Sequence, residues 1–158
     1  MEPKTLPHCG PRSNAASIAC GPQATQDQFL TELTAAELKW LSHDWLFWAR
    51  PPQLPPQAGW HIWLFLGGRG AGKTRAGAEW IRAKVAAGCR RIALIAPTLN
   101  DAREVMIGGA SGLANIGPDE ERPRFESSRR RLIWPCGAEG HVFSAEDPDS
   151  LRGPQFEA

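Results

Sequence analysis

The sequence predicts an α/β fold built on a mostly parallel sheet. Three observations carry this prediction: two apolar runs of strand length at residues 60–66 and 90–97, a helix-like segment after each run, and a glycine-rich loop between the first run and its helix. Strand–helix repeats of this kind produce parallel strands joined by right-handed crossovers.

Composition places the chain among ordinary globular proteins, because 42 % of its 158 residues are hydrophobic and 22 % are charged. A net charge of +1 gives no overall preference for nucleic acid. No run reaches the roughly 18 apolar residues of a membrane span, and the N-terminus lacks the apolar core of a signal peptide. We therefore expect a cytoplasmic protein without membrane contact. Its cysteines lie far apart, which predicts reduced, unpaired thiols at Cys9, Cys20, Cys89 and Cys136.

The N-terminal part divides into a tail and a helix. Residues 1–27 are rich in proline, glycine and small polar residues, which predicts a disordered tail before a domain over residues 28–158. Thr34 and Glu37 have the spacing of a capping box, and apolar residues at helical spacing predict a helix over 34–49. The prolines at 51 and 52 end it.

The rest of the chain alternates between strand and helix patterns. After the predicted strand at 60–66, a helix begins near Lys73 and ends at Gly88. The second strand, at 90–97, precedes a helix over 99–107 that Thr98 and Asp101 start with a capping signal. Residues 111–123 are expected to form a loop, and residues 124–147 two or three short strands with turns near 127–128 and 137–140.

The glycine-rich loop has the pattern Gly67-x-x-x-x-Gly72-Lys73-Thr74, in the strand-to-helix context that a phosphate-binding loop requires. Glycines let backbone N–H groups turn inward around an anion, and the following helix N-terminus adds a positive field. We expect Lys73 to reach the β and γ phosphates and the Thr74 hydroxyl to bind Mg²⁺. The nucleotide-binding residues are Gly67, Gly68, Arg69, Gly70, Ala71, Gly72, Lys73 and Thr74. The other interpretation is a structural turn, which has no need of this lysine and threonine.

Arg69 lies inside the loop, and its role has two interpretations. Its guanidinium would lie against the γ phosphate and stabilise transition-state charge, which would make Arg69 a catalytic residue with Lys73. Alternatively, it would point outward, toward a neighbouring subunit or an acidic surface.

The runs FLGGRGAGKTRAGAEWIR, APTLNDAREVMIGGASGL and EDPDSLRGPQFEA resemble the large terminase subunit of tailed phages, and more closely the terminase-like DNA-packaging proteins of prophages and gene transfer agents. The resemblance covers residues 35–158. It implies a three-layer, RecA-like P-loop ATPase that drives double-stranded DNA into a capsid, here incomplete at the C-terminal edge of its sheet. It also implies ATP and Mg²⁺, a homo-oligomeric ring, portal and small terminase subunit partners, and the cytoplasm of a bacterial host.

The resemblance also places the segment from Trp48 to Gln53 near the adenine. The simpler interpretation is that Trp48 is a core residue and that Gln53 lies in an exposed linker. Hydrolysis in this class needs an Asp that orients Mg²⁺ and a Glu that positions water. The nearest candidates are Glu146, Asp147 and Asp149, which fit poorly. The resemblance puts that acidic pair, the coupling motif and a nuclease half beyond Ala158. A second hypothesis is therefore a truncated, non-hydrolysing nucleotide-binding remnant, and a third is a small-molecule kinase, whose substrate lid is not evident.

The remaining charged residues and histidines each have a structural interpretation beside a functional one. The arginine cluster, Arg122, Arg124 and Arg129–Arg131, would either contact DNA phosphates or form a solvated turn rim. The single histidines, His61 and His141, are expected to be packed or exposed rather than catalytic. Arg152 lies in a loop that the resemblance places near the ATPase core, where it would sense nucleotide or contact a neighbour.

Overall fold

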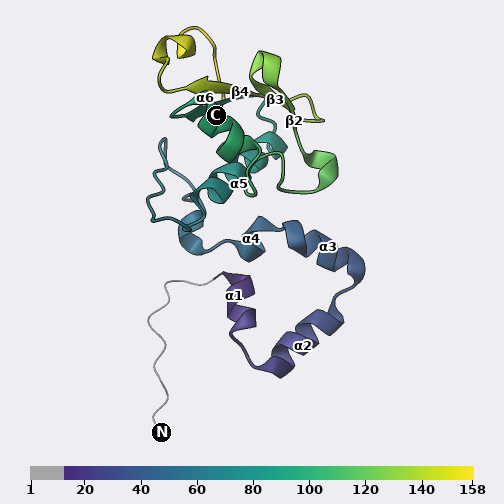
Figure 1. Cartoon of the computed structure of the whole chain (residues 1–158). Coiled ribbons are helices and arrows are strands. Elements are labelled where there is room, and N and C mark those ends of the chain that lie inside the picture. The colour runs from purple at the N-terminus through teal and green to yellow at the C-terminus, as the bar shows by residue number, and fades with distance from the viewer. Residues whose placement is uncertain (1–12) are drawn as a thin grey trace. The chain divides into compact units, whose positions relative to one another are not determined.

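The computed structural model describes residues 13–158 (Figure 1). The chain divides into two compact units, Met1–Leu66 and Gly67–Ala158, each described here by itself. Residues 1–12 of the predicted disordered tail lie outside the described residues. None of the helices among residues 13–158 is long and apolar enough to cross a membrane.

The first unit contains short helices: α1 (Asn14–Ala19), α2 (Gln23–Glu32), α3 (Ala35–His43), α4 (Trp45–Trp48) and the 3₁₀ helix η1 (Pro51–Gln53). Helix α1 and the first half of α2 occupy residues of the predicted disordered tail. Local capping explains α1, because the Ser13 side chain accepts a hydrogen bond from the Ala16 N–H. Phe29 of α2 stacks on Phe47 of α4, so apolar packing holds α2 as well.

The helix predicted over 34–49 is present as two pieces. Its start is confirmed, since Thr34 and Glu37 form the expected capping box. The break falls at Asp44, whose side chain accepts a hydrogen bond from the Leu46 N–H at 3.0 Å and so starts α4 anew. An internal Asp competes with helix continuation in this way because its carboxylate mimics a cap.

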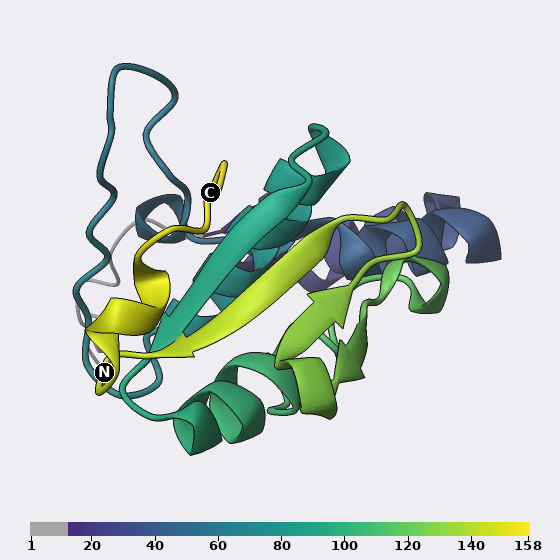
Figure 2. The same cartoon turned by 90° about the horizontal axis from the view of Figure 1, so that it is seen from above.

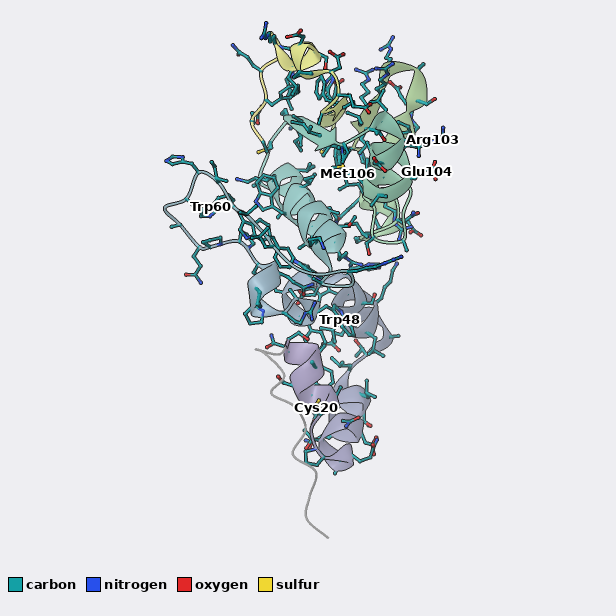
Figure 3. The ribbon with its side chains drawn as sticks, turned by 60° about the vertical axis from the view of Figure 1, so that its left-hand side comes forward. Cys20, Trp48, Trp60, Arg103, Glu104 and Met106 are labelled. Atoms are coloured by element: carbon teal, nitrogen blue, oxygen red, sulfur yellow. The ribbon has the colours of Figure 1, made fainter. Side chains whose placement is uncertain are left out.

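The strand predicted over 60–66 is wrong: this segment has no strand structure. Ile62, Leu64 and Leu66 are 86 %, 73 % and 77 % exposed. Its aromatic residues contact one another instead, with Trp63 stacked on Phe65 and edge-on to Trp60 (Trp60 is labelled in Figure 3). A strand exists only when a partner strand satisfies its backbone groups, and the apolar run alone does not specify that partner.

The second unit consists of two layers, in which helices pack on a β-sheet. Helix α5 (Lys73–Ala86) leads to β1 (Arg91–Ala96), followed by α6 (Leu99–Asp101), a π-helical turn η2 (Ala102–Ile107) and the 3₁₀ helix η3 (Asp119–Glu121). The strands β2 (Arg124–Glu126) and β3 (Arg131–Ile133) flank η4 (Ser127–Arg129), and β4 (Glu139–Ser144) precedes η5 (Pro148–Leu151). Apart from 60–66, the strand and helix predictions for this part of the chain are confirmed.

The strand order is β1-β4-β3-β2, with β1 parallel to β4 and both other pairs antiparallel. The prediction of a mostly parallel sheet is therefore wrong. The reason is that residues 124–144 fold back on themselves through short turns, and Arg130 (φ 50°) and Gly137 (φ 84°) supply the left-handed backbone that such turns need. β4 then returns beside β1, as Figure 2 shows.

The core lies on one face of this sheet. Ile92, Leu94 and Ala96 alternate with exposed or half-buried neighbours along β1 and pack with Ala78 and Ile81 of α5. η2 adds Ala102 and Ile107 to the same cluster. On the opposite face Ile95 remains 48 % exposed. Within residues 67–158 the helices thus form one layer over the sheet, so the predicted three-layer arrangement is not seen there.

The chain's last residues run beside the outer edge of β1. The Glu157 N–H donates to the Arg91 carbonyl at 2.8 Å, and the Ala93 N–H donates to the Ala158 carbonyl at 2.8 Å. Phe156 packs edge-on to Phe143 of β4 with ring centroids 5.5 Å apart. These contacts cover part of an edge that otherwise presents unpaired backbone groups.

Ion pairs cross the open face of the sheet. Arg131 donates from Nε to Glu126 and from Nη1 to Glu139, at 2.9 and 2.8 Å. The hydrogen bond from Arg131 holds the pKa of Glu126 below its ordinary value.

This pair predicts a pH effect on stability. Because the folded pKa of Glu126 is depressed, its stabilisation is present above the ordinary value of 4.5 and is lost as pH falls through the folded pKa. We expect the unfolding free energy to fall as the pH drops below 4.5, and to fall less steeply in Glu126→Gln. Urea unfolding of both proteins between acidic and neutral pH measures this. If the unfolding free energy of both proteins falls equally steeply with decreasing pH, carboxylates other than Glu126 dominate the pH dependence of stability.

Candidate phosphate-binding loop

The loop Gly67–Thr74 lies wholly within the second unit and leads directly into α5. Gly70 and Gly72 both have φ of +81°, a left-handed conformation that a side chain would strain. Gly72 is the residue that caps α5. Gly67 is close to Ala71, since a Cβ at position 67 would stand 2.7 Å from the Ala71 Cβ. The glycine pattern is therefore explained by backbone shape at these positions.

Lys73 folds back over the loop. Its Nζ donates hydrogen bonds to the carbonyl oxygens of Gly67 at 2.8 Å and Gly68 at 2.9 Å. The ammonium group thus lies at the loop itself, although the side chain is exposed to solvent. A flexible, exposed cation held by two carbonyls is available to exchange them for phosphate oxygens.

Thr74 and Arg69 differ in their surroundings. Thr74 is half-buried in the first turn of α5, where its hydroxyl lies at the positive end of a 14-residue helix. Arg69 is exposed, and among residues 13–158 it has no hydrogen-bond or ion-pair partner. Both alternatives for Arg69, the γ phosphate and an outside partner, remain compatible with this position. The catalytic, magnesium and nucleotide assignments to these residues stay predictions.

The residues present fit a polyphosphate with Mg²⁺. The loop offers a cation at Lys73, a hydroxyl at Thr74 and a helix N-terminus behind them. Mg²⁺ keeps most of its water ligands and needs few protein ligands. Among residues 13–158, no group of three or more His, Cys, Asp or Glu side chains forms a separate metal site.

The predicted acidic candidates are exposed. Glu146 follows β4, and its Oε2 lies 3.4 Å from the Ser144 hydroxyl. Asp149 pairs with Arg152 at 3.2 Å, and both side chains are largely exposed. Asp147 is exposed as well. The structure gives none of these carboxylates a buried, oriented position.

The placement of the adenine near Trp48 and Gln53 stays a prediction, but the simpler interpretation of these two residues is wrong. Trp48 is 49 % exposed, and its indole N–H donates to the Leu41 carbonyl at 2.7 Å, so it is not a core residue (Figure 3). Gln53 is buried at 7 % exposure rather than an exposed linker residue. Its Oε1 accepts a hydrogen bond from the Arg50 N–H at 2.8 Å.

The arginine cluster is largely paired within the fold. Arg131 and Arg124 both contact Glu126, while Arg122 pairs with Asp119 at 2.6 Å. His141 lies 3.1 Å from Glu139, in agreement with a structural role, and His61 is exposed. The described cysteines, Cys20, Cys89 and Cys136, are free thiols as predicted; Cys9 lies outside the described residues.

A buried carboxylate on α5 was not singled out from the sequence. Glu79 is 4 % exposed and accepts from Arg75 at 2.7 Å and from Arg82 at 2.6 Å. Arg82 also reaches Glu121 of η3 at 2.9 Å. The signal was present, because Arg75 and Arg82 lie four residues before and three after Glu79, which places all three on one helix face.

A cavity of about 230 Å³ lies directly beside the loop. Lys73, Thr74, Gly77, Ala78 and Ile81 form one wall from successive turns of α5. Met106 and Leu113 form the other, and Figure 3 shows Met106 on the side of η2 that faces α5. No sequence pattern indicates this space, since it depends on where η2 packs.

Comparison with known families identifies the second unit of the chain. Residues 64–158 match the family model described as terminase large subunit, T4likevirus-type, N-terminal. No curated protein and no solved structure matches the chain significantly. The matched region contains the loop, α5 and the whole sheet, which is the second unit of the structure almost residue for residue. The chain therefore belongs to the terminase large subunit family, and its role lies in phage DNA packaging.

Proposed function

We propose that residues 67–158 form the nucleotide-binding part of a packaging motor, which binds ATP with Mg²⁺ at Gly67–Thr74. The observation that carries the proposal is the geometry of Lys73. Its ammonium is poised over a loop with two left-handed glycines, at the start of a long helix. Those features together create a site for a polyphosphate.

Each residue then has a distinct role in binding. Backbone N–H groups of the loop enclose the phosphates, and Lys73 neutralises their charge. The Thr74 hydroxyl ligates Mg²⁺, and that ion supplies charge neutralisation at the β and γ phosphates. Arg69, exposed and unpaired within the described residues, is placed in the loop to meet either the γ phosphate or a neighbouring subunit. We also propose that the chain works in a ring that moves double-stranded DNA, docked on a portal and assisted by a small terminase subunit.

A second function is favoured by one specific observation. The candidate carboxylates Glu146, Asp147 and Asp149 are all exposed, and Arg152 pairs with Asp149. A water-activating carboxylate works from a fixed position beside the substrate. We therefore propose that the chain, as a separate molecule, binds nucleotide without efficient hydrolysis.

Binding and turnover are tested together. The 158-residue chain is titrated with a fluorescent ATP analogue in the presence of Mg²⁺, and phosphate release is followed in the same buffer. We expect saturable binding, competed by unlabelled ATP, with phosphate release at the background rate. Absence of saturable binding contradicts the nucleotide site. Rapid phosphate release contradicts the second function and supports a complete catalytic centre.

A further inference from the structure

We propose that the turn between β2 and β3, residues 127–130, holds the phosphate backbone of double-stranded DNA through Arg129 and Arg130. This inference rests on the proposed function, because that function makes DNA the molecule that the chain moves. It adds the surface of this chain that contacts the DNA, and this surface shares no residue with the loop Gly67–Thr74.

The first argument is that the carboxylates of this hairpin are already neutralised. Residues 124–131 contain four arginines and one glutamate, Glu126. Glu126 pairs with both Arg124 and Arg131, at 2.9 Å in each case. Arg131 also pairs with Glu139 of β4 at 2.8 Å. Two of the four arginines thus balance the acidic side chains, and the charges of the other two remain uncompensated.

Arg129 and Arg130 are those other two residues. Both are exposed, and within residues 13–158 neither side chain has a hydrogen-bond or ion-pair partner. A guanidinium group binds phosphate oxygens through parallel N–H donors and stays charged at neutral pH. Consecutive positions in the turn therefore present two positive charges to an anion from outside the chain.

The backbone at Arg130 gives a second argument. Its φ is +50° and its ψ is +47°, and among residues 13–158 it is the only residue other than glycine with a positive φ. A side chain in this left-handed conformation is strained, and glycine or asparagine is the usual residue there. The shape of the turn therefore does not explain an arginine at position 130, whereas a role for its side chain does.

The composition of the turn favours a phosphate backbone over a protein partner. All four of its residues are exposed and polar, and Ser127 and Ser128 add hydroxyl donors beside the two arginines. Protein–protein interfaces depend on large anchors packed at their centre, which are often aromatic, and the turn has no apolar side chain. Arginine and serine are both common donors to DNA phosphates.

The position of the turn indicates how the DNA is contacted. β2 is the last strand in the order of the sheet, and the turn follows it as η4. Figure 1 shows η4, in light green, extending beyond the two strands that it joins. A short protruding turn of this kind meets the outside of a duplex, where the phosphates lie. We therefore expect binding that depends little on DNA sequence, because phosphate contacts carry no sequence information.

DNA binding by the full chain tests this surface. Its affinity for a fluorescein-labelled duplex of mixed sequence is measured by fluorescence anisotropy without nucleotide, between about 50 and 200 mM salt. We expect a wild-type dissociation constant of about 1–100 μM at physiological salt. The double variant Arg129→Gln, Arg130→Gly should bind at least about tenfold more weakly at low salt. Its slope of log affinity against log salt should become shallower by about two, which is one for each lost phosphate contact.

The variants are chosen so that loss of binding is not loss of fold. Glycine accepts a φ of +50° without strain, so the unfolding free energy of the double variant in urea should not fall. Replacing both arginines by lysine keeps the charges and should retain the affinity within about threefold. The matched control is Lys39→Gln with Lys84→Gln, which removes two charges from α3 and α5 and should change the affinity by less than about twofold.

The inference is overturned if the wild type does not bind DNA, if the arginine double variant binds as tightly as the wild type, or if the lysine control loses as much affinity. It is also overturned if polyglutamate displaces the labelled duplex as effectively as unlabelled DNA of equal charge, because the turn is then a contact for an acidic protein. ATP titration of the same preparation tests the proposed nucleotide site. A chain that binds ATP but not DNA keeps that site and lacks this surface, so the two failures are distinguishable.

Discussion

Lys73→Ala should reduce the affinity of the chain for both ATP and tripolyphosphate by at least about 100-fold. The reason is that Lys73 supplies a mobile charge at the loop, and hydrogen bonds to charged groups contribute about 1.5–3 kcal/mol each. In the structure its Nζ already bonds two loop carbonyls, at 2.8 and 2.9 Å, so it is within reach of a ligand held there. Calorimetric titration with each ligand measures the loss.

The matched control is Lys84→Ala on the same helix. Lys84 lies in the last turn of α5, and its Nζ stands 5.4 Å from the centre of the Trp80 ring. It carries the same charge as Lys73 but lies about 16 Å farther along the helix axis. We expect its loss to change affinity by less than about twofold, because surface charges at that distance are screened by salt. If Lys73→Ala binds both ligands with unchanged affinity, the loop is not the binding site.

Glu79→Ala should lower the unfolding free energy by about 2–4 kcal/mol, measured by urea denaturation. Its side chain is 3 % exposed, and its carboxylate pairs with both Arg75 and Arg82. Removing one partner of a buried ion pair leaves uncompensated charge, which costs about 3–5 kcal/mol when the remaining charge is fully buried. The two arginines are 31 % and 18 % exposed, so water relieves part of this cost.

A comparison with an exposed ion pair sharpens this result. Glu104→Ala breaks a pair with Arg103 at 3.5 Å in which both side chains are more than 60 % exposed. Such surface pairs contribute about 0–1 kcal/mol, so this control should change stability little. Arg82 also needs Gly117, which leaves room for its guanidinium. A loss below 1 kcal/mol in Glu79→Ala would show that Arg75 and Arg82 find other partners.

The comparison of sequence and structure shows which signals were sufficient. Local signals predicted well: the Thr34–Glu37 capping box, the helix after the loop and the Thr98 cap are all present. Each depends on hydrogen bonds between residues three or four apart. Segments whose structure depends on distant partners were predicted less well. The run 60–66 is apolar enough for a strand, but backbone pairing that would make it one is not seen.

The same distinction between local and distant signals applies to the candidate site. The loop residues were readable from the sequence because glycine, lysine and threonine each have a local chemical reason to be there. The cavity beside the loop was not, because it arises where Met106 and Leu113 approach α5 from later in the chain. Glu79 lay between these cases: its spacing from Arg75 and Arg82 was visible, but that spacing does not show that Glu79 is only 4 % exposed.

The back-folded position of Lys73 has a consequence for affinity. The Gly67 and Gly68 carbonyls act as an internal competitor for the ammonium group, so a ligand meets a site in which its main counter-charge is already engaged. The observed dissociation constant then equals the intrinsic one divided by the fraction of molecules with Lys73 released. Exposed side chains change rotamer within picoseconds to nanoseconds, so Lys73 leaves the two carbonyls far faster than a ligand arrives. The competition therefore weakens binding without limiting the rate of association.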